Sequence, residues 1–298
     1  MQRICHAVTT KFPDLKFIGL CHEIKSMNRQ LPDLMETEMH NIEYRAAGLN
    51  HLSILLEARY KNTGKDGYPI IKQNFDAYFS DLVNKHDAKP SKPGAERGVF
   101  RKLFKTYGYL PITTDSHLGE YIQWAYSVAD HDAILDFYDN YKEKCLAFYD
   151  NKTSYDHYFD LKNLDTHERV VPIIEGILSD SAYEEPAINI PNNGYIEFLP
   201  KDIVVEVPGI INKSGISGIS FKNYPAAFGS LLNSQSGVIQ MTTDAVLNAS
   251  KHSAYLALLA DPVVNDSYQA EKLLNNMLET QGKFLYLSLI HISEPTRR

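Results

Sequence analysis

Two short segments carry side chains that could bind a metal ion. Residues 19–23 read Gly-Leu-Cys-His-Glu, and residues 48–51 read Gly-Leu-Asn-His. Each segment ends a short apolar run, so Cys21 and His51 are expected at the ends of strands. A thiolate and an imidazole together suit a soft or borderline divalent ion. Two such side chains do not by themselves make a metal site, and a packed thiol beside a structural imidazole is the alternative interpretation.

The residues around these two segments resemble the family 4 glycoside hydrolases, which are NAD-dependent and metal-dependent glycosidases. The likeness continues along the chain through residues 114–121 (Thr-Asp-Ser-His-Leu-Gly-Glu-Tyr), 189–194 (Asn-Ile-Pro-Asn-Asn-Gly), 204–208 (Val-Val-Glu-Val-Pro) and 257–262 (Ala-Leu-Leu-Ala-Asp-Pro). Separated blocks that keep their order over nearly the whole chain make this resemblance specific. It implies that Cys21 and His51 are ligands of manganese or another divalent metal.

The resemblance also implies a reaction that differs from hydrolysis by two carboxylates. NAD⁺ takes a hydride from C3 of the sugar, and the resulting ketone acidifies the proton on C2. A base removes that proton, and the glycosidic bond at C1 breaks by elimination. Water then adds, and the hydride returns to C3. The metal would bind the C2 and C3 oxygens and stabilise their negative charge as a Lewis acid.

Residues 114–121 supply the candidates for the base that removes the C2 proton. Asp115 is one candidate, because a partly desolvated carboxylate beside a metal could accept a proton near neutrality. Tyr121 is the rival base, and a helix N-cap is the alternative role for Asp115. His117 and Glu120 are expected to bind sugar hydroxyls or to support the site. A His and a Glu three residues apart also make an ordinary contact on one helix face.

The residues beside the two expected ligands are further candidates. In relatives with an aspartate after the cysteine, the resemblance implies that this aspartate is the leaving-group acid. Here that position is His22, so His22, Glu23 or a water molecule is left for the role. Asn50 is expected to bond a sugar hydroxyl, with a turn role as the alternative. Asn192 and Asn193 could also contact sugar, although asparagine in a turn tolerates left-handed dihedral angles.

Composition narrows the class of protein. With 298 residues, of which 44% are hydrophobic, the chain can bury a sizeable core. The net charge of -7 argues against binding to nucleic acid or to an anionic membrane. No apolar run approaches the roughly 20 residues that span a bilayer, and no signal peptide is evident. Three cysteines are too few for a disulfide framework, which fits a reducing cytoplasm. The expected partners are a small-molecule glycoside and, from the resemblance, further copies of the chain in a dimer or tetramer.

Both ends of the chain read as interrupted. Met1 leads directly into a stretch that reads as a helix in mid-course, and no Gly-x-Gly-x-x-Gly occurs in the 298 residues. The resemblance implies an N-terminal Rossmann domain that binds NAD, so we expect that domain to be missing here. Residues 287–298 match the translation of a sequencing adapter and are excluded from fold reasoning. Residues 1–286 are then the N-terminally truncated catalytic domain, and the fragment alone is expected to be inactive.

The hydrophobic pattern predicts helices and a few strands without regular alternation, which is typical of an α+β domain. The resemblance implies the C-terminal domain of the lactate dehydrogenase and family 4 glycosidase type. Strands are predicted at residues 15–20, 42–46, 52–60, 203–207 and 216–221. Helices are predicted at residues 4–12, 23–40 with a break at Pro32, 74–83, 99–107, 133–149, 170–178, 224–258 and 267–285. Residues 84–98 and 189–200 are expected to be loops, and Cys145 is expected in the core.

Two other functions remain open from the sequence. A dehydrogenase of the lactate or malate type would share the NAD-linked chemistry but would use an Arg/His/Asp set and no metal cysteine. An inactive fragment is the other alternative, because the face that covers the missing domain would be exposed.

Overall fold

The computed structural model describes residues 1–85, 97–129, 131–150 and 169–284. Its strands are β1 (Ile42–Leu49), β2 (Leu52–Tyr60), β3 (Tyr183–Pro191), β4 (Val204–Asn212) and β5 (Gly215–Gly218). Its α-helices are α1 (Gln2–Lys11), α2 (Met27–Met35), α3 (Tyr68–Lys85), α4 (Gly98–Tyr107), α5 (Asp115–Leu118), α6 (His131–Asp150), α8 (Val170–Ser179), α9 (Ala226–Leu247), α10 (Lys251–Ala260) and α11 (Ser267–Gln281). Short 3₁₀ helices include Glu23–Ser26 and Gln123–Ser127. The α+β class is confirmed.

The sheet is antiparallel and has the order β2-β1-β4-β3, with β5 paired to β4. β1 and β2 form a hairpin that closes at the pair Leu49 and Leu52, so Asn50 and His51 are its turn. β1 meets β4 at one residue pair, Gly48 opposite Glu206. The hairpin turn therefore lies beside the middle of the sheet.

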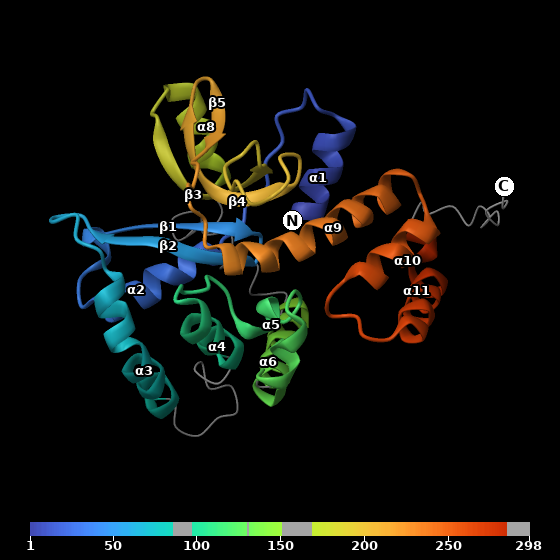
Figure 1. Ribbon diagram of the computed structural model, residues 1–298, viewed down its shortest axis with the longest axis horizontal. Helices are drawn as coiled ribbons and strands as arrows, with labels where there is room; N and C mark the ends of the chain where they lie inside the picture. Colours follow the sequence, from blue (N-terminus) through green and yellow to red (C-terminus); the bar gives the residue numbers. More distant parts are fainter. Residues whose placement is uncertain (86–96, 130, 151–168, 285–298) are drawn as a thin grey trace.

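Helices surround this sheet on more than one side (Figure 1). Helices α2 to α6 lie on the lower side of the β1–β2 hairpin in this view, and α8 and β5 lie above it. The long helix α9 packs along α1, and α10 and α11 follow at the far end of the molecule. The core contains Leu49, Leu52 and Ile54 of the hairpin with a cluster of phenylalanine rings from α3 and α4. This core fixes the hairpin turn against the segment that carries α5.

Several predicted elements differ from the observed ones. The predicted strand at residues 15–20 is wrong, because only Gly19 makes a bridge, to Asn189 of β3. Pro32 lies inside α2 and does not break it. The predicted loop at residues 189–200 begins within β3. The predicted helix at residues 224–258 is two helices, because Ala249 has a φ of 48° and the side chain of Ser250 caps α10.

Helix α6 is present where it was predicted, but its apolar stripe is not in the core. Phe137 is 45% exposed and Tyr141 is 59% exposed. Cys145 is half-buried, so its predicted place in the core is wrong. A periodic apolar stripe indicates a helix face, and it does not say what covers that face.

Some predictions fall on residues that the structure does not describe. Most of the loop predicted at residues 84–98 and all of the adapter-like segment 287–298 lie outside the described ranges. Within those ranges, no helix has both the length and the apolar character needed to cross a membrane.

Candidate active site

The hairpin turn between β1 and β2 presents His51 in an unusual backbone conformation. The φ angle of His51 is 65°, in the left-handed region that costs a residue with a side chain about 1–2 kcal/mol. Gly48 is required before the turn, since a Cβ there would lie 2.4 Å from the carbonyl oxygen of Leu52. Strained backbone held by packing is found at many functional sites, which makes this turn a candidate for one.

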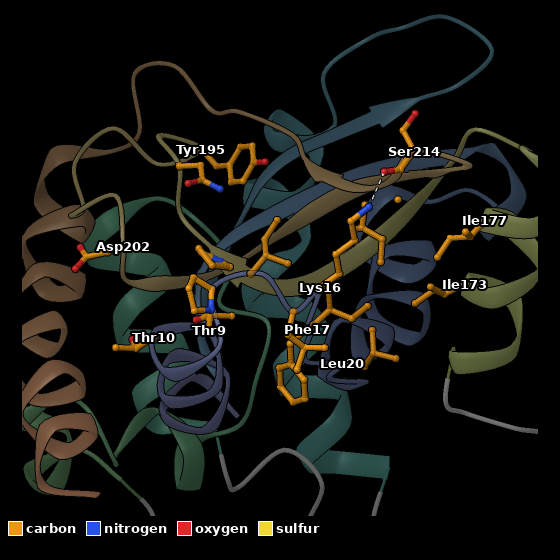
Figure 2. Close-up of a pocket in the computed structure, with 18 of the residues that line it drawn as sticks. Thr9, Thr10, Lys16, Phe17, Leu20, Ile173, Ile177, Tyr195, Asp202 and Ser214 are labelled. Atoms are coloured by element: carbon orange, nitrogen blue, oxygen red, sulfur yellow. Dashed lines mark hydrogen bonds between the residues drawn. The ribbon is translucent and has the colours of Figure 1, made fainter. Parts of the chain in front are cut away.

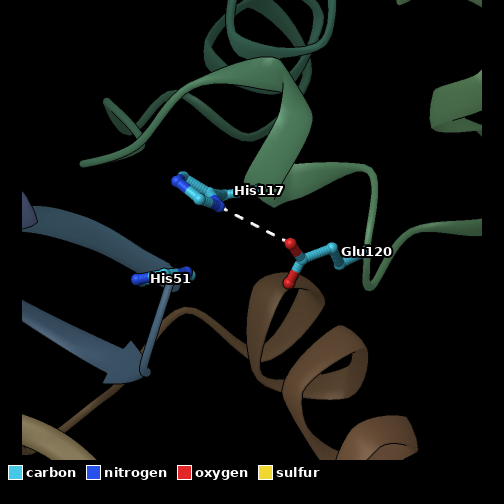
Figure 3. A group of neighbouring side chains, drawn as sticks. All are labelled: His51, His117 and Glu120. Carbon is cyan, nitrogen blue, oxygen red and sulfur yellow. Dashed lines mark ion pairs between the residues drawn. The ribbon is translucent and has the colours of Figure 1, made fainter. Parts of the chain in front are cut away.

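Figure 3 shows the imidazole of His51 facing two side chains from the α5 region, His117 and Glu120. The ring centroids of the two histidines are 4.2 Å apart. His117 Nδ1 lies 3.6 Å from Glu120 Oε1. One ligand atom from each of the three residues lies within 4.8 Å of the other two. The cluster therefore joins the hairpin turn to the short helix α5.

The protonation of this cluster suits a metal site. Burial, followed by the charge of His117, lowers the pKa of His51, which favours the neutral imidazole that ligates metals. The neighbouring His117 imidazole is the main cause that lowers the pKa of Glu120. Near neutral pH the cluster thus offers an imidazole lone pair and an ionised carboxylate.

The spacing of these donors also fits a divalent ion. Nitrogen and oxygen ligands bind such ions at about 2.0–2.2 Å, so two ligands of one ion are at most about 4.4 Å apart. The observed limit of 4.8 Å needs only a small movement of the side chains. His117 and Glu120, predicted to bind sugar hydroxyls, therefore lie at distances that also suit metal ligands.

Cys21 is not a member of this three-residue group, but it is linked to the same turn. Hydrogen bonding from the backbone of Glu23 and from the side chain of Asn50, the residue before His51, acts to lower the pKa of its thiol. Burial, with a smaller contribution from the charge of Glu206, raises the pKa of the Cys21 thiol to about 11. A cation bound at the sulfur would favour the thiolate instead.

The carboxylate of Asp115 has structural partners on both oxygens. Oδ2 accepts the N–H of Val99 at 2.8 Å, and Oδ1 accepts the N–H of Phe100 at 2.9 Å. These N–H groups belong to the first turn of α4, which has no other acceptors within its own helix. Asp115 is 0% exposed. Its role as the base stays a prediction. The geometry favours Asp115 as a cap of α4, whereas the sequence suggested a cap of the helix from Ser116 onward.

Tyr121 is buried beside Glu120 and close to Arg3 of α1. Burial, followed by the charge of Glu120, raises the pKa of the Tyr121 hydroxyl to about 12. The charge of Arg3 and a hydrogen bond from it act in the opposite direction. Sequence reasoning missed Arg3, because nothing in the pattern of α1 indicates what it contacts.

The remaining candidates have different surroundings. The His22 imidazole is mostly exposed and lines a pocket of about 260 Å³ together with Cys21. The amide nitrogen of Asn50 donates to Glu206 Oε2 at 2.8 Å, so it is already engaged. Asn192 is buried and donates to the carbonyls of residues 196, 199 and 200, which gives it a structural role in its turn. Asn193 has a φ of 45°, as asparagine in a turn allows.

Glu206 is a second residue that sequence reasoning gave no role. It lies on β4, is 2% exposed, and accepts hydrogen bonds from Asn50, Ser53 and Asn189. Burial raises the pKa of its carboxyl group despite these donors. A single glutamate within the apolar run Val-Val-Glu-Val-Pro was the signal that could have found it, because carboxylates are rarely buried without partners.

A larger groove lies elsewhere, between α1, α8 and β5, and has a volume of about 1040 Å³ (Figure 2). Its walls are mostly apolar and include Ile173, Ile177 and Leu20. Lys16 Nζ donates to the carbonyl oxygen of Ser214 across it, at 3.4 Å. Asn193 lines this groove, and the expected metal ligands do not.

Comparison with known proteins decides the family. Residues 46–264, which include the hairpin turn and the α5 cluster, match the Family 4 glycosyl hydrolase C-terminal domain. The chain belongs to this family. An alpha-glucosidase of Erwinia rhapontici is 39% identical and is matched over 96% of this chain and 66% of its own length. An alpha-galactosidase of Bacillus subtilis strain 168 is 28% identical over 85% of this chain and 56% of its own length.

Solved structures of family 4 glycosyl hydrolases have the same fold. A 6-phospho-alpha-glucosidase from gut microorganisms, in complex with NAD and Mn²⁺, matches 95% of this chain and 66% of its own chain, with a TM-score of 0.75 and 19% identity. A putative glucosidase lplD from Bacillus subtilis matches 93% of this chain and 66% of its own, with a TM-score of 0.75 and 24% identity. This family 4 chain thus spans at most about two thirds of the length of these relatives.

Proposed function

We propose that this chain is the metal-binding and sugar-binding part of a glycosidase that hydrolyses an α-linked O-glycosidic bond of a sugar or uronide. The observation that carries the proposal is the convergence of His51, His117 and Glu120 within the segment that matches the family. Bound NAD⁺ would supply reversible oxidation at C3 of the sugar, and a bound divalent metal, Mn²⁺ or a similar ion, would supply Lewis acidity at the C2 and C3 oxygens.

The chain's own residues would hold that metal at the hairpin turn. His51 offers a neutral imidazole, and Cys21 offers a half-buried thiol. His117 and Glu120 are the other two members of the His51 group and would add a nitrogen and an oxygen donor. Thiolate is an unusual partner for a hard ion such as Mn²⁺, and the oxygen donor of Glu120 makes the set more suitable.

Tyr121 is the residue that we assign as the base for the C2 proton. Its hydroxyl adjoins the metal-binding cluster through Glu120, whereas both oxygens of Asp115 bond to α4. Arg3 lowers the pKa of Tyr121, and a cation in the cluster would lower it further. Tyr121 Oη would then accept the proton from C2, and His22 would return one to the leaving oxygen at C1.

We base the proposed substrate on the names of relatives and the proposed cellular compartment on the chemistry of the cysteine ligand. The relatives bear the names alpha-glucosidase, alpha-galactosidase and alpha-galacturonidase, which is why the proposal names an α-linked sugar or uronide. A free metal-binding cysteine requires reducing conditions, so we place the protein in the cytoplasm. We also propose a homo-oligomer and an NAD site that lies mostly outside these residues.

The test is hydrolysis of a panel of nitrophenyl α-glycosides and uronides. The protein is expressed from its gene with any residues that the reading frame encodes before Met1, and is assayed with and without NAD⁺ and Mn²⁺. We expect hydrolysis only when both are present, and loss of at least about 100-fold in His51→Ala. Hydrolysis that continues after NAD⁺ has been removed and a metal chelator has been added would contradict the proposal.

The dehydrogenase alternative is tested by adding 2-hydroxy acids to the substrate panel and following NADH formation. A dehydrogenase would accumulate NADH with a 2-hydroxy acid, whereas the proposed reaction returns its hydride to the sugar. Net NADH formation that keeps pace with substrate turnover would favour the dehydrogenase.

A further inference from the structure

Glu206 lies where the separate parts of the candidate site meet. Its backbone stands opposite Gly48 of β1 on one side and opposite Asn189 of β3 on the other. Gly48 leads into the turn that carries His51, and Asn189 pairs with Gly19 in the segment that carries Cys21. Glu206 is thus the central residue of a three-strand junction.

The side chain of Glu206 accepts hydrogen bonds from residues of the hairpin turn, β2 and β3. Oε2 accepts from Asn50 Nδ2 at 2.8 Å and from Asn189 Nδ2 at 3.1 Å, and Oε1 accepts from Ser53 Oγ at 3.1 Å. A buried carboxylate is destabilising unless such donors surround it. Loss of the carboxylate would leave two buried amide nitrogens without this acceptor.

Each amide in this network controls the position of one expected metal ligand. Asn50 immediately precedes His51 in the hairpin turn, next to the Leu49–Leu52 pair. Asn189 exchanges two backbone hydrogen bonds with Gly19, at 2.8 Å and 3.0 Å, two residues before Cys21. Gly19 has no room for a side chain, because Cys5 Sγ and Met1 Cγ would each lie 2.6 Å from a Cβ there. The segment before Cys21 is therefore held from both sides.

We infer that Glu206 is a positioning residue that orients Asn50 and Asn189 and so fixes Cys21 and His51 relative to each other before a metal binds. The inference rests on the proposed function only in treating Cys21 and His51 as metal ligands. Partners that orient metal ligands are typically worth 10–100-fold in metal affinity. A glutamate that only stabilises the sheet would leave metal affinity unchanged in the folded protein.

Glu185 provides a matched control for Glu206. It is 3% exposed on the neighbouring strand β3, and its Oε2 accepts from Arg169 Nε and from the Tyr183 hydroxyl, both at 3.2 Å. No hydrogen bond of the described network links it to Asn50. Glu185 lines the same small pocket as Cys21 but is bonded to Arg169 and Tyr183 and not to the Glu206 network, so Glu185→Gln should lower stability without moving His51.

The experiment measures Mn²⁺ binding to the full chain by electron paramagnetic resonance, without NAD or sugar, together with thermal unfolding of the metal-free protein. We expect Glu206→Gln to weaken Mn²⁺ binding about 10–100-fold, and Glu185→Gln to change it less than about twofold. If Glu206 acts through Asn50, the double variant Glu206→Gln/Asn50→Ala should bind no more weakly than the worse single variant. Equal Mn²⁺ affinity in folded Glu206→Gln and the parent, or fully additive losses, would overturn the inference.

Two further measurements are included, one for a Glu206→Gln protein that does not fold and one to separate this inference from the proposed function. If Glu206→Gln does not fold, Glu206→Asp is measured in the same way. Glu206→Asp keeps the negative charge but shortens the side chain by one methylene. We expect it to bind Mn²⁺ at least about threefold more weakly than the parent. If the role of Glu206 is only structural, Mn²⁺ affinity should not change. Comparison of the parent with His51→Ala separates this inference from the proposed function. Equal Mn²⁺ affinity in the parent and in His51→Ala would overturn both the proposed function and the role of Glu206. Weaker Mn²⁺ binding in His51→Ala, with unchanged binding in the Glu206 variants, would overturn the positioning role alone.

Discussion

The imidazole rings of His51 and His117 lie with their centroids 4.2 Å apart, although one belongs to a hairpin turn and the other to helix α5. Burial and the neighbouring ring lower the pKa of His51, so two adjacent imidazoles can face one site without charge repulsion. This pairing is the geometric basis for placing a divalent ion between the hairpin and α5.

Replacing His117 tests whether it shares that ion. We expect His117→Ala to weaken Mn²⁺ binding at least about tenfold, because one of the converging donors is removed. The measurement is a calorimetric titration with Mn²⁺ at constant pH. His40→Ala is the control, since His40 is exposed and pairs only with Glu38 among the ion pairs observed for the described residues. Unchanged affinity in His117→Ala would limit His117 to the sugar contact predicted from the sequence.

The reactivity of Cys21 should depend steeply on pH. Burial raises the pKa of its thiol to about 11, and the thiolate is the reactive form. Alkylation by iodoacetamide should therefore accelerate about tenfold for each pH unit between pH 7 and pH 10. The rate is followed by mass spectrometry of the peptide that contains Cys21, in metal-free protein. A plateau reached below pH 9 would contradict the raised pKa.

Asp115 should matter for stability more than for proton transfer. Asp115→Asn keeps one acceptor for α4 and loses the other, which should lower the free energy of unfolding by about 1–3 kcal/mol in urea titrations. Asp76→Asn is the comparison, because Asp76 is exposed and its ion pair with Lys105 is worth at most about 1 kcal/mol. An Asp115→Asn protein with parental stability and no glycosidase activity would instead support Asp115 as the base.

Gly48 should tolerate no larger residue. In Gly48→Ala, the new Cβ would lie 2.4 Å from the Leu52 carbonyl oxygen and 2.6 Å from Ser53 Cα, both backbone atoms. We expect a loss of about 1–3 kcal/mol in the free energy of unfolding and weaker Mn²⁺ binding as the turn shifts. Gly237→Ala in α9 has open space and should be stabilising by up to about 1 kcal/mol. Equal effects of the two substitutions on thermal unfolding would contradict the close packing at the turn.

The sequence predicted well those features that depend on local pattern. The strands predicted at residues 42–46 and 52–60 are both present, and the apolar spacing predicts helices α4, α8 and α11 near their observed bounds. The motif around His51 predicts a functional turn only through the family resemblance, because a lone histidine is as readily a structural imidazole. These features need only short-range chemistry to be recognised.

The features that the sequence did not predict depend on contacts between distant segments. Asp115 begins the short helix α5, which suggests a local cap, and only the fold brings the start of α4 onto its carboxylate. Glu206 sits in an apolar strand, and its three donors come from β2, β3 and the hairpin turn. The stripe on α6 has a helical period, and its exposure follows from which elements pack against it. Such relationships are set by tertiary structure and leave no periodic signal.

The most direct test of the central claim is the fate of the proton on C2 of the sugar. The protein, expressed with any residues encoded before Met1, is incubated in D₂O with NAD⁺, Mn²⁺ and an α-glycoside that it cleaves, and the released sugar is analysed by NMR and mass spectrometry. Removal and return of the C2 proton predict deuterium at C2 of the product, and free sugar incubated in the same solution without the enzyme should carry none. Efficient cleavage that leaves protium at C2 would contradict elimination, and with it the roles assigned to Tyr121 and to the metal site at His51.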